Sequence, residues 1–221
     1  MKAILTSSDL TQIDGGIELA ERMIGKPRSE INIAVINEAS AVEFGDHRWA
    51  IDALRNLADN FGGNVEIIHL LAIPLERAVE RVMAADMLFV LGGNTEWLKS
   101  VFDKTGFSGA LPGILGEKLY VGSSAGSMVL GHQPSYENQA KVFGPYDTFG
   151  VENYLDLLDL SIMPHFRTTH WGDRKEEWVI RESASVPYPV YAIEDNAAVV
   201  VDGDEIRIIG DGFKLVGGEV K

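Results

Sequence analysis

The residues best suited to chemistry lie in Gly122-Ser-Ser-Ala-Gly126, which follows an apolar run from Leu119 to Val121. The run predicts a short buried strand, and the apolar residues after the second glycine predict a helix. A serine at the apex of a sharp strand-to-helix turn is the nucleophile-elbow pattern G-x-S-x-G. The glycines let strand and helix approach closely while Ser124 exposes its hydroxyl in a strained conformation. We interpret Ser124 as a nucleophile; the alternative is a turn that binds an anion or only joins two elements.

A serine hydroxyl needs a base within hydrogen-bond reach, and the sequence has five histidines. His165 follows the apolar run 160–163 in a Pro-His-Phe turn, a position comparable to that of Ser124. We favour His165 as the base, with His170 second. The other three are expected elsewhere: His69 in the core, His47 at a helix start, and His132 beyond reach on the segment that leaves the elbow.

The acid that would orient the base is sought between Ser124 and His165. Five carboxylates lie there: Glu137, Asp147, Glu152, Asp156 and Asp159. We place Glu137, just past the elbow helix, first and Asp147 second. The alternative for each is a solvated loop carboxylate.

Two backbone stretches could stabilise the oxyanion that forms on an attacked carbonyl. The amide of Ala125 lies at the predicted helix N-terminus, where N–H groups have no partner within the helix. The turn Gly92-Gly-Asn94 follows another apolar strand, and glycine lets its amides approach a carbonyl closely. The alternative for this turn is a tight β–α connection capped by Asn94 or Thr95.

The elements around these residues predict an α/β fold. Apolar runs are expected as strands and amphipathic stretches as helices: strands at 3–6, 31–36, 65–71, 87–91 and 160–163, helices ending near 25 and at 49–61, 75–83 and 176–183. Their alternation predicts a mostly parallel, doubly wound sheet with helices on both faces. Residues 191–220, with the Asp202-Gly203 turn, predict antiparallel strands at one edge. We expect one domain over 1–221, with a long irregular segment at 131–156.

Composition limits the partners. The chain has 221 residues, 46% of them hydrophobic, a formal net charge of −14 and no cysteine. This charge argues against nucleic acid and anionic membrane. We also find no signal peptide and no apolar run near the roughly 18 residues of a membrane span. We therefore expect a cytoplasmic protein that needs no cofactor or metal; a homodimer is one expectation for its assembly.

Three stretches occur together in order: Leu91-Gly-Gly-Asn-Thr95, Gly122-Ser-Ser-Ala-Gly126 and Met163-Pro-His-Phe166. They resemble the peptidase E (aspartyl dipeptidase) family of serine peptidases, which is related to the cyanophycinases. The resemblance extends over most of the chain, from Thr6-Ser-Ser8 to the closing strands. It implies a fold similar to class I glutamine amidotransferases, with a flavodoxin-like core.

The resemblance also implies roles. Ser124 matches the family nucleophile and His165 its base, while the amides of Gly93 and Ala125 match the oxyanion hole. Family members hydrolyse dipeptides and short peptides with an N-terminal aspartate, and a basic residue after the histidine reads its carboxylate. Arg174 is the best match and Arg167 a nearer alternative, because a guanidinium can hold a carboxylate with two hydrogen bonds. For Arg174 the alternative is a surface residue at a helix start. Asn94 is counted among the substrate-binding residues.

One departure concerns the acid. Better-known members carry an aspartate in a loop after the nucleophile, followed by a short apolar pair, and this pattern is absent here. The stretch Tyr136-Glu-Asn138 indicates a glutamate variant. We therefore predict a serine peptidase with a Ser-His-acid triad and an acyl-enzyme intermediate.

Other functions fit the residues less well. An amidotransferase normally needs a cysteine at the elbow, and the chain has none. An α/β-hydrolase esterase needs more chain between serine and histidine than lies between Ser124 and His165. A cyanophycinase-like peptidase for β-aspartyl-arginine bonds and a non-catalytic binding protein on the same scaffold remain as alternatives.

Overall fold

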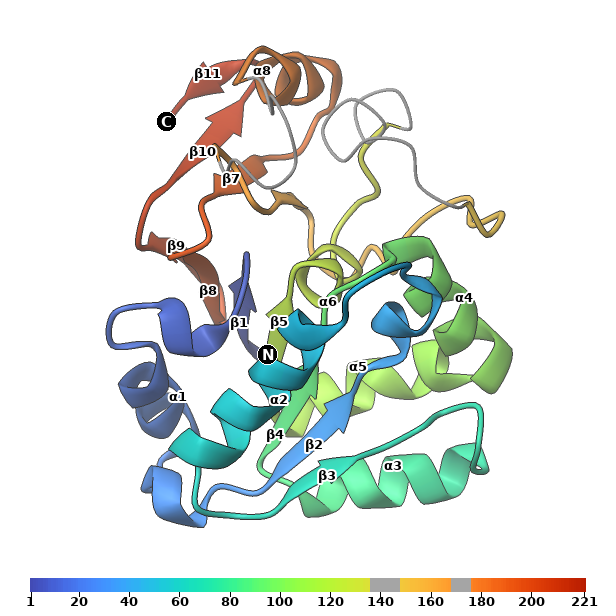
Figure 1. Ribbon diagram of the computed structural model, residues 1–221. Helices are drawn as coiled ribbons and strands as arrows, with labels where there is room; N and C mark the ends of the chain where they lie inside the picture. Colours follow the sequence, from blue (N-terminus) through green and yellow to red (C-terminus); the bar gives the residue numbers. More distant parts are fainter. Residues whose placement is uncertain (136–147, 168–175) are drawn as a thin grey trace.

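A seven-stranded sheet forms the centre of the protein (Figure 1). The structure is a computed structural model that describes residues 1–135, 148–167 and 176–221. The strand order is β3-β2-β4-β5-β1-β8-β9. Its strands are β1 (Lys2–Thr6), β2 (Ile33–Ile36), β3 (Val65–Ile67), β4 (Met87–Val90), β5 (Leu119–Ser123), β8 (Ala198–Asp202) and β9 (Glu205–Ile209). The first five pair in parallel, and β8 and β9 continue the sheet antiparallel.

Helices cover both faces of this sheet, because its strands are apolar on both sides. On β1, the side chain of Ile4 packs into one buried cluster, whereas those of Ala3 and Leu5 pack into the other. The first cluster includes α1 (Gly16–Ile24) and α2 (Arg48–Asn60); the second includes α3 (Leu75–Ala84), α4 (Thr95–Thr105) and α5 (Phe107–Glu117). Short 3-10 helices add η1 (Leu10–Gln12), η2 (Arg28–Glu30) and η3 (Glu38–Val42). The predicted fold class is confirmed.

A second, four-stranded sheet lies beyond the carboxyl ends of the central strands (Figure 1). Its order is β11-β10-β7-β6, with β6 (Ser161–Met163), β7 (Val190–Ile193), β10 (Gly212–Val216) and β11 (Glu219–Val220). Helix α8 (Glu176–Ser185) packs on it and shares a small apolar cluster with β7 and β10. The C-terminal residues thus do more than extend the central sheet, because they also build this sheet together with β6.

The region after β3 differs from the sequence prediction. The strand ends at Ile67 rather than continuing to residue 71. Ile68 and Leu70 are buried, but His69 between them is exposed. The expected core position of His69 is therefore wrong, because the buried sites here belong to the two aliphatic residues on either side of it.

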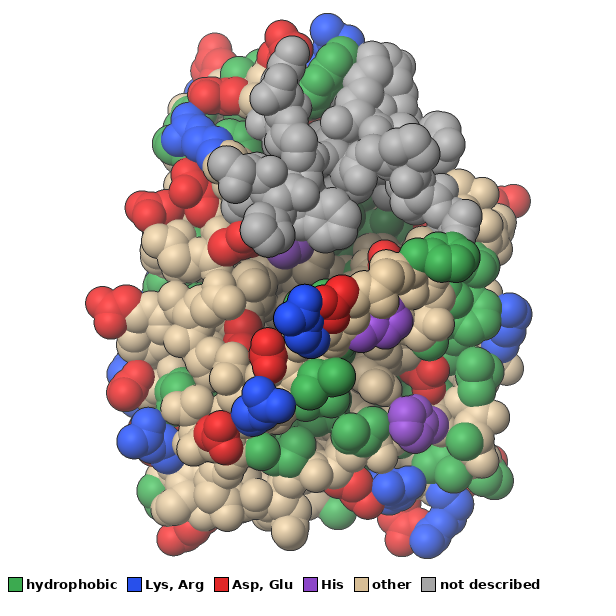
Figure 2. All heavy atoms as spheres, in the orientation of Figure 1, with side chains coloured by type: hydrophobic (Ala, Val, Ile, Leu, Met, Phe, Trp, Pro, Cys, Tyr) green, Lys and Arg blue, Asp and Glu red, His purple; other side chains and the backbone are tan. Residues whose placement is uncertain are grey.

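The distribution of charged side chains on the surface agrees with the acidic composition of the chain. On the face in Figure 2, basic side chains are interspersed among acidic ones and form no continuous patch. Within the part of the chain that the structure describes, no helix has the length and apolar character to cross a membrane.

Candidate active site

Three side chains that each lie just after a strand form a chain of hydrogen bonds. Ser124 follows β5, His165 comes two residues after β6, and Asp195 comes two residues after β7. His165 Nε2 lies 2.9 Å from Ser124 Oγ, and His165 Nδ1 lies 2.6 Å from Asp195 Oδ1. The structure therefore brings together the serine and the histidine singled out from sequence. It adds a carboxylate on the far side of the imidazole.

The turn at Ser124 has the geometry of a nucleophile elbow. Ser124 has φ 47° and ψ −107°, and its N–H donates to the Thr6 carbonyl at 3.0 Å. The helix α6 (Ala125–Met128) begins at the next residue. A Cβ on Gly126 would lie 2.1 Å from the Val90 carbonyl oxygen, so only glycine fits where this helix crosses β4.

A buried tyrosine supports the same turn. Tyr120 donates its hydroxyl to the Gly126 carbonyl at 2.6 Å, and its side chain is fully buried. Burial raises the pKa of the Tyr120 hydroxyl, so the group remains a donor throughout the ordinary pH range. Two hydrogen bonds thus hold the strained turn at Ser124, one to the Thr6 carbonyl at the end of β1 and one from the Tyr120 hydroxyl of β5.

The histidine is also held in an uncommon backbone conformation. His165 has φ 58°, a region that bulky residues rarely adopt. Its N–H donates to Ser7 Oγ at 2.5 Å, and the next N–H, that of Phe166, donates to the Ile193 carbonyl at 3.0 Å. The imidazole orientation is therefore fixed from the backbone as well as through its two ring nitrogens.

Sequence reasoning misses Asp195 because it seeks the acid only between the serine and the histidine. A usable signal is present: Glu194 and Asp195 directly follow the apolar run Val190–Ile193. Because β6 and β7 are parallel, with Met163 opposite Ala192, the residues after both strands emerge at one edge. Parallel pairing of these two runs would have placed Asp195 beside His165.

The carboxylates that the sequence offers as the acid have other positions. Glu137 and Asp147 lie outside the described residues, as do His170 and Arg174. Asp156 and Asp159 each lie 3.0 Å from a ring nitrogen of His132, which stacks on the Tyr188 ring at a centroid distance of 4.0 Å. Glu152 is exposed. Asp156 and Asp159 thus contact His132 rather than His165.

The turn after β4 lies directly beside the nucleophile. A Cβ on Gly92 would lie 3.1 Å from the Ser124 Cβ. Gly93 has φ 131°, and a Cβ there would lie 2.2 Å from the Ala39 carbonyl oxygen, so this close approach to η3 requires glycine. The Asn94 N–H donates to the same carbonyl at 2.9 Å. The turn is therefore rigidly seated next to Ser124.

Asn94 caps a helix. Its side-chain Oδ1 accepts the Trp97 N–H at 2.9 Å, and its side chain is buried at the start of α4. This is the capping arrangement that the sequence offered as the alternative for the turn. Whether Asn94 also contacts a substrate stays a prediction.

Arg167 is engaged in protein contacts. Its Nη2 lies 2.9 Å from Glu176 Oε2, and its Nη1 lies 3.8 Å from Glu194 Oε1. The guanidinium carbon also lies 4.9 Å and 4.8 Å from the ring centroids of Phe166 and Phe213. These contacts give Arg167 a structural role in joining α8 to the β7–β8 turn.

Two buried carboxylates fasten the segment that connects the nucleophile to the histidine. Glu96 Oε2 accepts the Phe149 N–H at 2.8 Å, and its Oε1 lies 3.5 Å from Gln133 Nε2. Glu182 accepts the N–H and the hydroxyl of Ser135 at 3.1 Å and 2.9 Å. Because Glu96 lies in the first turn of α4, it ties this segment to the helix that follows Gly93.

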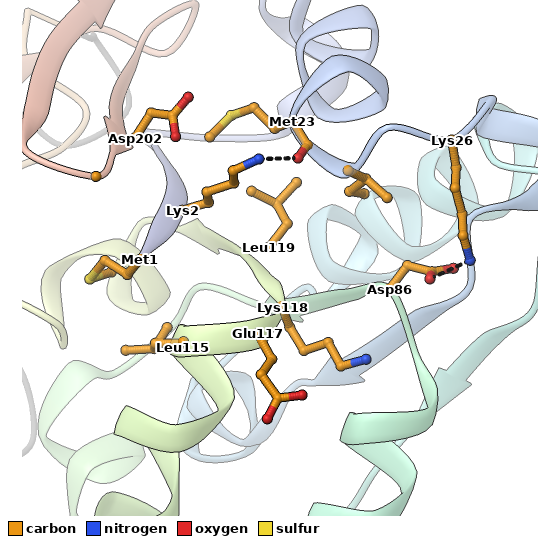
Figure 3. A pocket seen from close by; sticks show the side chains of 13 residues that line it. Met1, Lys2, Met23, Lys26, Asp86, Leu115, Glu117, Lys118, Leu119 and Asp202 are labelled. Atoms are coloured by element: carbon orange, nitrogen blue, oxygen red, sulfur yellow. Dashed lines mark hydrogen bonds and ion pairs between the residues drawn. The ribbon is translucent and has the colours of Figure 1, made fainter.

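A pocket of about 480 Å³ lies at the opposite end of the central sheet (Figure 3). Lys2 and Leu119, at the beginnings of β1 and β5, line it together with Asp86. Lys2 Nζ donates to the Met23 carbonyl at 2.8 Å, and Lys26 pairs with Asp86 at 2.6 Å. The pocket is thus separated from Ser124 by the length of the strands. Among the described residues, no group of three or more metal-ligating side chains could hold a metal ion.

Comparisons with known proteins agree on a family. A family model described as Peptidase family S51 matches residues 4–209. An uncharacterized peptidase of Pasteurella multocida is 24% identical over 214 residues, which are 96% of this chain and 99% of the relative. A peptidase E of Streptomyces coelicolor is 28% identical over 174 residues, which are 75% of this chain and 68% of the relative.

Solved structures share the fold. The crystal structure of a peptidase E candidate from Listeria monocytogenes has a TM-score of 0.75 at 23% identity, covering 94% of this chain and 96% of that chain. A peptidase from an acI-B1 actinobacterium has a TM-score of 0.69 at 18% identity, covering 100% of this chain and 92% of that chain. At these identities the likeness shows a common fold.

Proposed function

This chain belongs to peptidase family S51, and we propose that it hydrolyses short peptides through Ser124, His165 and Asp195. It is a serine-type peptidase of the peptidase E type, as the sequence predicted. The single observation that carries the proposal is the continuous set of hydrogen bonds from Ser124 Oγ through the imidazole to Asp195 Oδ1. The same set of contacts activates serine in unrelated hydrolases.

The proposed reaction has two halves. Ser124 Oγ attacks the peptide carbonyl, and His165 Nε2 takes the hydroxyl proton as the Oγ–C bond forms. The C–N bond then breaks as the imidazolium gives this proton to the leaving amine. In the second half, water attacks the acyl-enzyme, gives a proton to His165, and releases the acid while Ser124 regains its proton.

The oxyanion would be held by backbone amides. The N–H of Ala125 is at the start of α6, and the Gly92-Gly93 turn lies against the Ser124 Cβ. In this proposal both backbone stretches donate to a substrate carbonyl bound in front of Ser124 Oγ. Because their backbones are fixed by neighbouring elements, the donors need little reorganisation as negative charge develops.

We assign the orienting role to Asp195. The carboxylate accepts the His165 Nδ1 proton, which fixes the tautomer that leaves Nε2 free to take a proton from Ser124. This assignment replaces Glu137, which lies outside the described residues. It also places the acid after the histidine in the chain.

We propose that the substrate is a dipeptide or short peptide with an N-terminal aspartate. The support for this proposal is the family resemblance, in which a basic residue after the histidine reads the aspartate carboxylate. Since Arg167 already contacts Glu176 and Glu194, we prefer Arg174 for this role. A cytoplasmic location and a homodimer likewise stay predictions.

Hydrolysis of a dipeptide panel tests the function. Asp-Leu and Asp-anilide would be compared with the Leu, Ala and β-Asp-Arg equivalents, for the wild type, Ser124→Ala and Arg174→Ala. We expect cleavage selective for aspartate, absent in Ser124→Ala and unselective in Arg174→Ala. Cleavage of the β-Asp-Arg compound alone would replace the aspartyl substrate by a cyanophycinase-like one. Hydrolysis that persists in Ser124→Ala would contradict the whole mechanism.

A further inference from the structure

A single hydroxyl outside the three proposed catalytic residues contacts two of them. Ser7 directly follows β1 and is fully buried. Its Oγ donates to Asp195 Oδ1 at 3.0 Å and accepts the His165 N–H at 2.5 Å. The carboxylate oxygen that receives the Ser7 proton is the same oxygen that lies 2.6 Å from His165 Nδ1.

The end of β1 also holds the nucleophile. The carbonyl of Thr6 accepts the Ser124 N–H at 3.0 Å, and the two strands are in parallel register with Thr6 opposite Ser123. Two consecutive residues at the end of one strand thus contact the backbone of Ser124, the backbone of His165 and the carboxylate of Asp195. Because these three come from β5, β6 and β7 in two different sheets, β1 is their common point of attachment.

We infer that Ser7 is a positioning residue, which sets the orientation of His165 and the basicity of Asp195 through one hydroxyl. The inference rests on the proposed function for its kinetic consequences. The Ser7 hydroxyl contacts the Asp195 carboxylate and the His165 N–H, and its proposed effect runs through these two partners. The Ser7 N–H donates to the Ala197 carbonyl at 3.1 Å, which fixes the hydroxyl relative to the turn that carries Asp195.

Ser7 and His165 share one hydrogen-bond acceptor, Asp195 Oδ1. A hydroxyl that donates to Asp195 Oδ1 withdraws electron density from the oxygen that also binds the imidazole. Without that donor, the carboxylate stabilises the imidazolium more strongly, so His165 would hold its proton to higher pH. The loss would also leave the His165 N–H, in a backbone region of positive φ, without its hydroxyl acceptor.

Neighbouring charged groups have contacts of their own. Glu194, on the same turn as Asp195, lies 3.8 Å from Arg167, and Asp211 accepts a hydrogen bond from Asn196 at 2.8 Å. A change in the pH profile on removing the Ser7 hydroxyl would therefore report on Asp195 and His165.

Replacement of Ser7 by alanine is the direct test, with Ser161→Ala as its matched control. Ser161 is equally buried, lies on β6 in the strand that leads to His165, and has a hydroxyl without a hydrogen-bond partner among the described residues. Both variants lose one buried oxygen, but only Ser7→Ala loses contacts to the proposed triad. Rates for the best substrate of the dipeptide panel would be measured from about pH 5 to about pH 9, the range in which histidine titrates.

For Ser7→Ala we expect kcat to fall by roughly 10- to 100-fold with KM within about twofold, and the acidic limb of the profile to move to higher pH. Ser161→Ala should keep the wild-type profile. Ser7→Cys, which keeps a donor at the same position but a weaker and larger one, should lie between the wild type and Ser7→Ala. A Ser7→Ala profile that coincides with the wild type, or an equal change in Ser161→Ala, would overturn the inference.

A readout without turnover separates this inference from the proposed function. The proton on His165 Nδ1 should give a far-downfield NMR signal that Asp195→Asn abolishes. The signal should shift in Ser7→Ala and keep its position in Ser161→Ala. If the wild type has no peptidase activity but the signal behaves in this way, the role of Ser7 stands while the proposed function fails. An unmoved signal in Ser7→Ala contradicts the role of Ser7.

Discussion

The two ends of the central sheet are built from the same strands but differ in kind. At the carboxyl end, Ser124 and His165 both have positive φ, and their N–H groups donate to two consecutive residues at the end of β1, Thr6 and Ser7. At the amino end, the polar groups around the pocket form separate contacts, such as Lys26 with Asp86 and Lys2 with the Met23 carbonyl (Figure 3). At the carboxyl end the backbone is strained and the hydrogen bonds join into one set. At the amino end the polar side chains form separate contacts.

The difference indicates where function resides. Strained backbone persists only where the surrounding structure fixes it, and such residues gather at functional sites. Independent surface pairs contribute little each and tolerate change. The comparison therefore predicts large effects on activity at the carboxyl end and small effects on stability at the amino end.

The largest effect should come from the nucleophile. Ser124→Ala removes the atom that would form the acyl-enzyme, and by analogy with other triads kcat should fall by roughly 10⁴- to 10⁶-fold. The thermal midpoint should change little, because a partly exposed hydroxyl is lost. Dipeptide hydrolysis and differential scanning calorimetry check both expectations. A loss below tenfold would remove the distinction between the two ends.

The next effect should come from the carboxylate. Asp195→Asn would leave the imidazole without its acid and favour the wrong tautomer, so we expect a loss of roughly 10²- to 10⁴-fold in kcat/KM. Glu194→Gln, one residue away and 3.8 Å from Arg167, should retain activity within about threefold. Steady-state kinetics compare the two variants. Equal losses would show that Asp195 has no special role.

Alanine substitution of one glycine at each end of the sheet tests how tightly the two ends are packed. In Gly126→Ala the new Cβ would lie 2.1 Å from the Val90 carbonyl oxygen, so we expect a loss of about 2–4 kcal/mol in the free energy of unfolding. Gly116, in α5 beside the pocket, has open space where a Cβ would lie, and Gly116→Ala should raise stability by about 0.5–1 kcal/mol. Urea denaturation measures both. A destabilised Gly116→Ala would contradict the comparison.

The smallest effect concerns Asp86. Burial alone would raise the pKa of the Asp86 carboxyl, but hydrogen bonds from Lys26 and the Asn32 N–H outweigh burial and hold this pKa below its usual value. The contact therefore stabilises the fold above the unfolded carboxyl's pKa of about 4, and this contribution is lost as the pH falls through the lower folded-state pKa. Asp86→Asn should cost about 1 kcal/mol at pH 7 and much less at pH 3, without change in kcat/KM.

The control for Asp86 is an exposed pair. Asp52 lies 3.0 Å from Arg55 with both side chains more than half exposed, so Asp52→Asn should change stability by less than about 0.5 kcal/mol at either pH. Urea titrations at pH 7 and pH 3 measure the free energy of unfolding of the wild type, Asp86→Asn and Asp52→Asn. A difference between Asp86→Asn and the wild type that grows toward pH 3 would have the wrong sign.

The order of elements and the elbow could be predicted from the sequence because both depend on local patterns. Continuous apolar runs such as Met87–Val90 mark buried strands, and Gly122-Ser-Ser-Ala-Gly126 marks a turn that few other residues can form. The fold class, the peptidase E resemblance and the serine-type enzyme are confirmed.

Asp195 and Ser7 could not be found in the same way, because their roles depend on which strands are neighbours. The apolar run Val190–Ile193 marks Asp195 as a residue at a strand end, but a solvated turn could equally follow such a strand. The role of Asp195 arises from the parallel pairing of β6 with β7 and from the antiparallel pairing of β8 with β1. Likewise, the sequence shows Ser7 only as a residue after the apolar run 3–6, and its role becomes visible once β1 lies beside β5.

Covalent labelling tests the central claim most directly. Incubation with a fluorophosphonate, followed by peptide mass spectrometry, reports whether one serine is activated, independent of any choice of substrate. We predict that the wild type is labelled on Ser124 alone, that Ser124→Ala is not labelled, and that labelling of Asp195→Asn is slower by at least about 100-fold. Labelling of Ser124 at the same rate in Asp195→Asn, or no labelling of the wild type, would contradict the account.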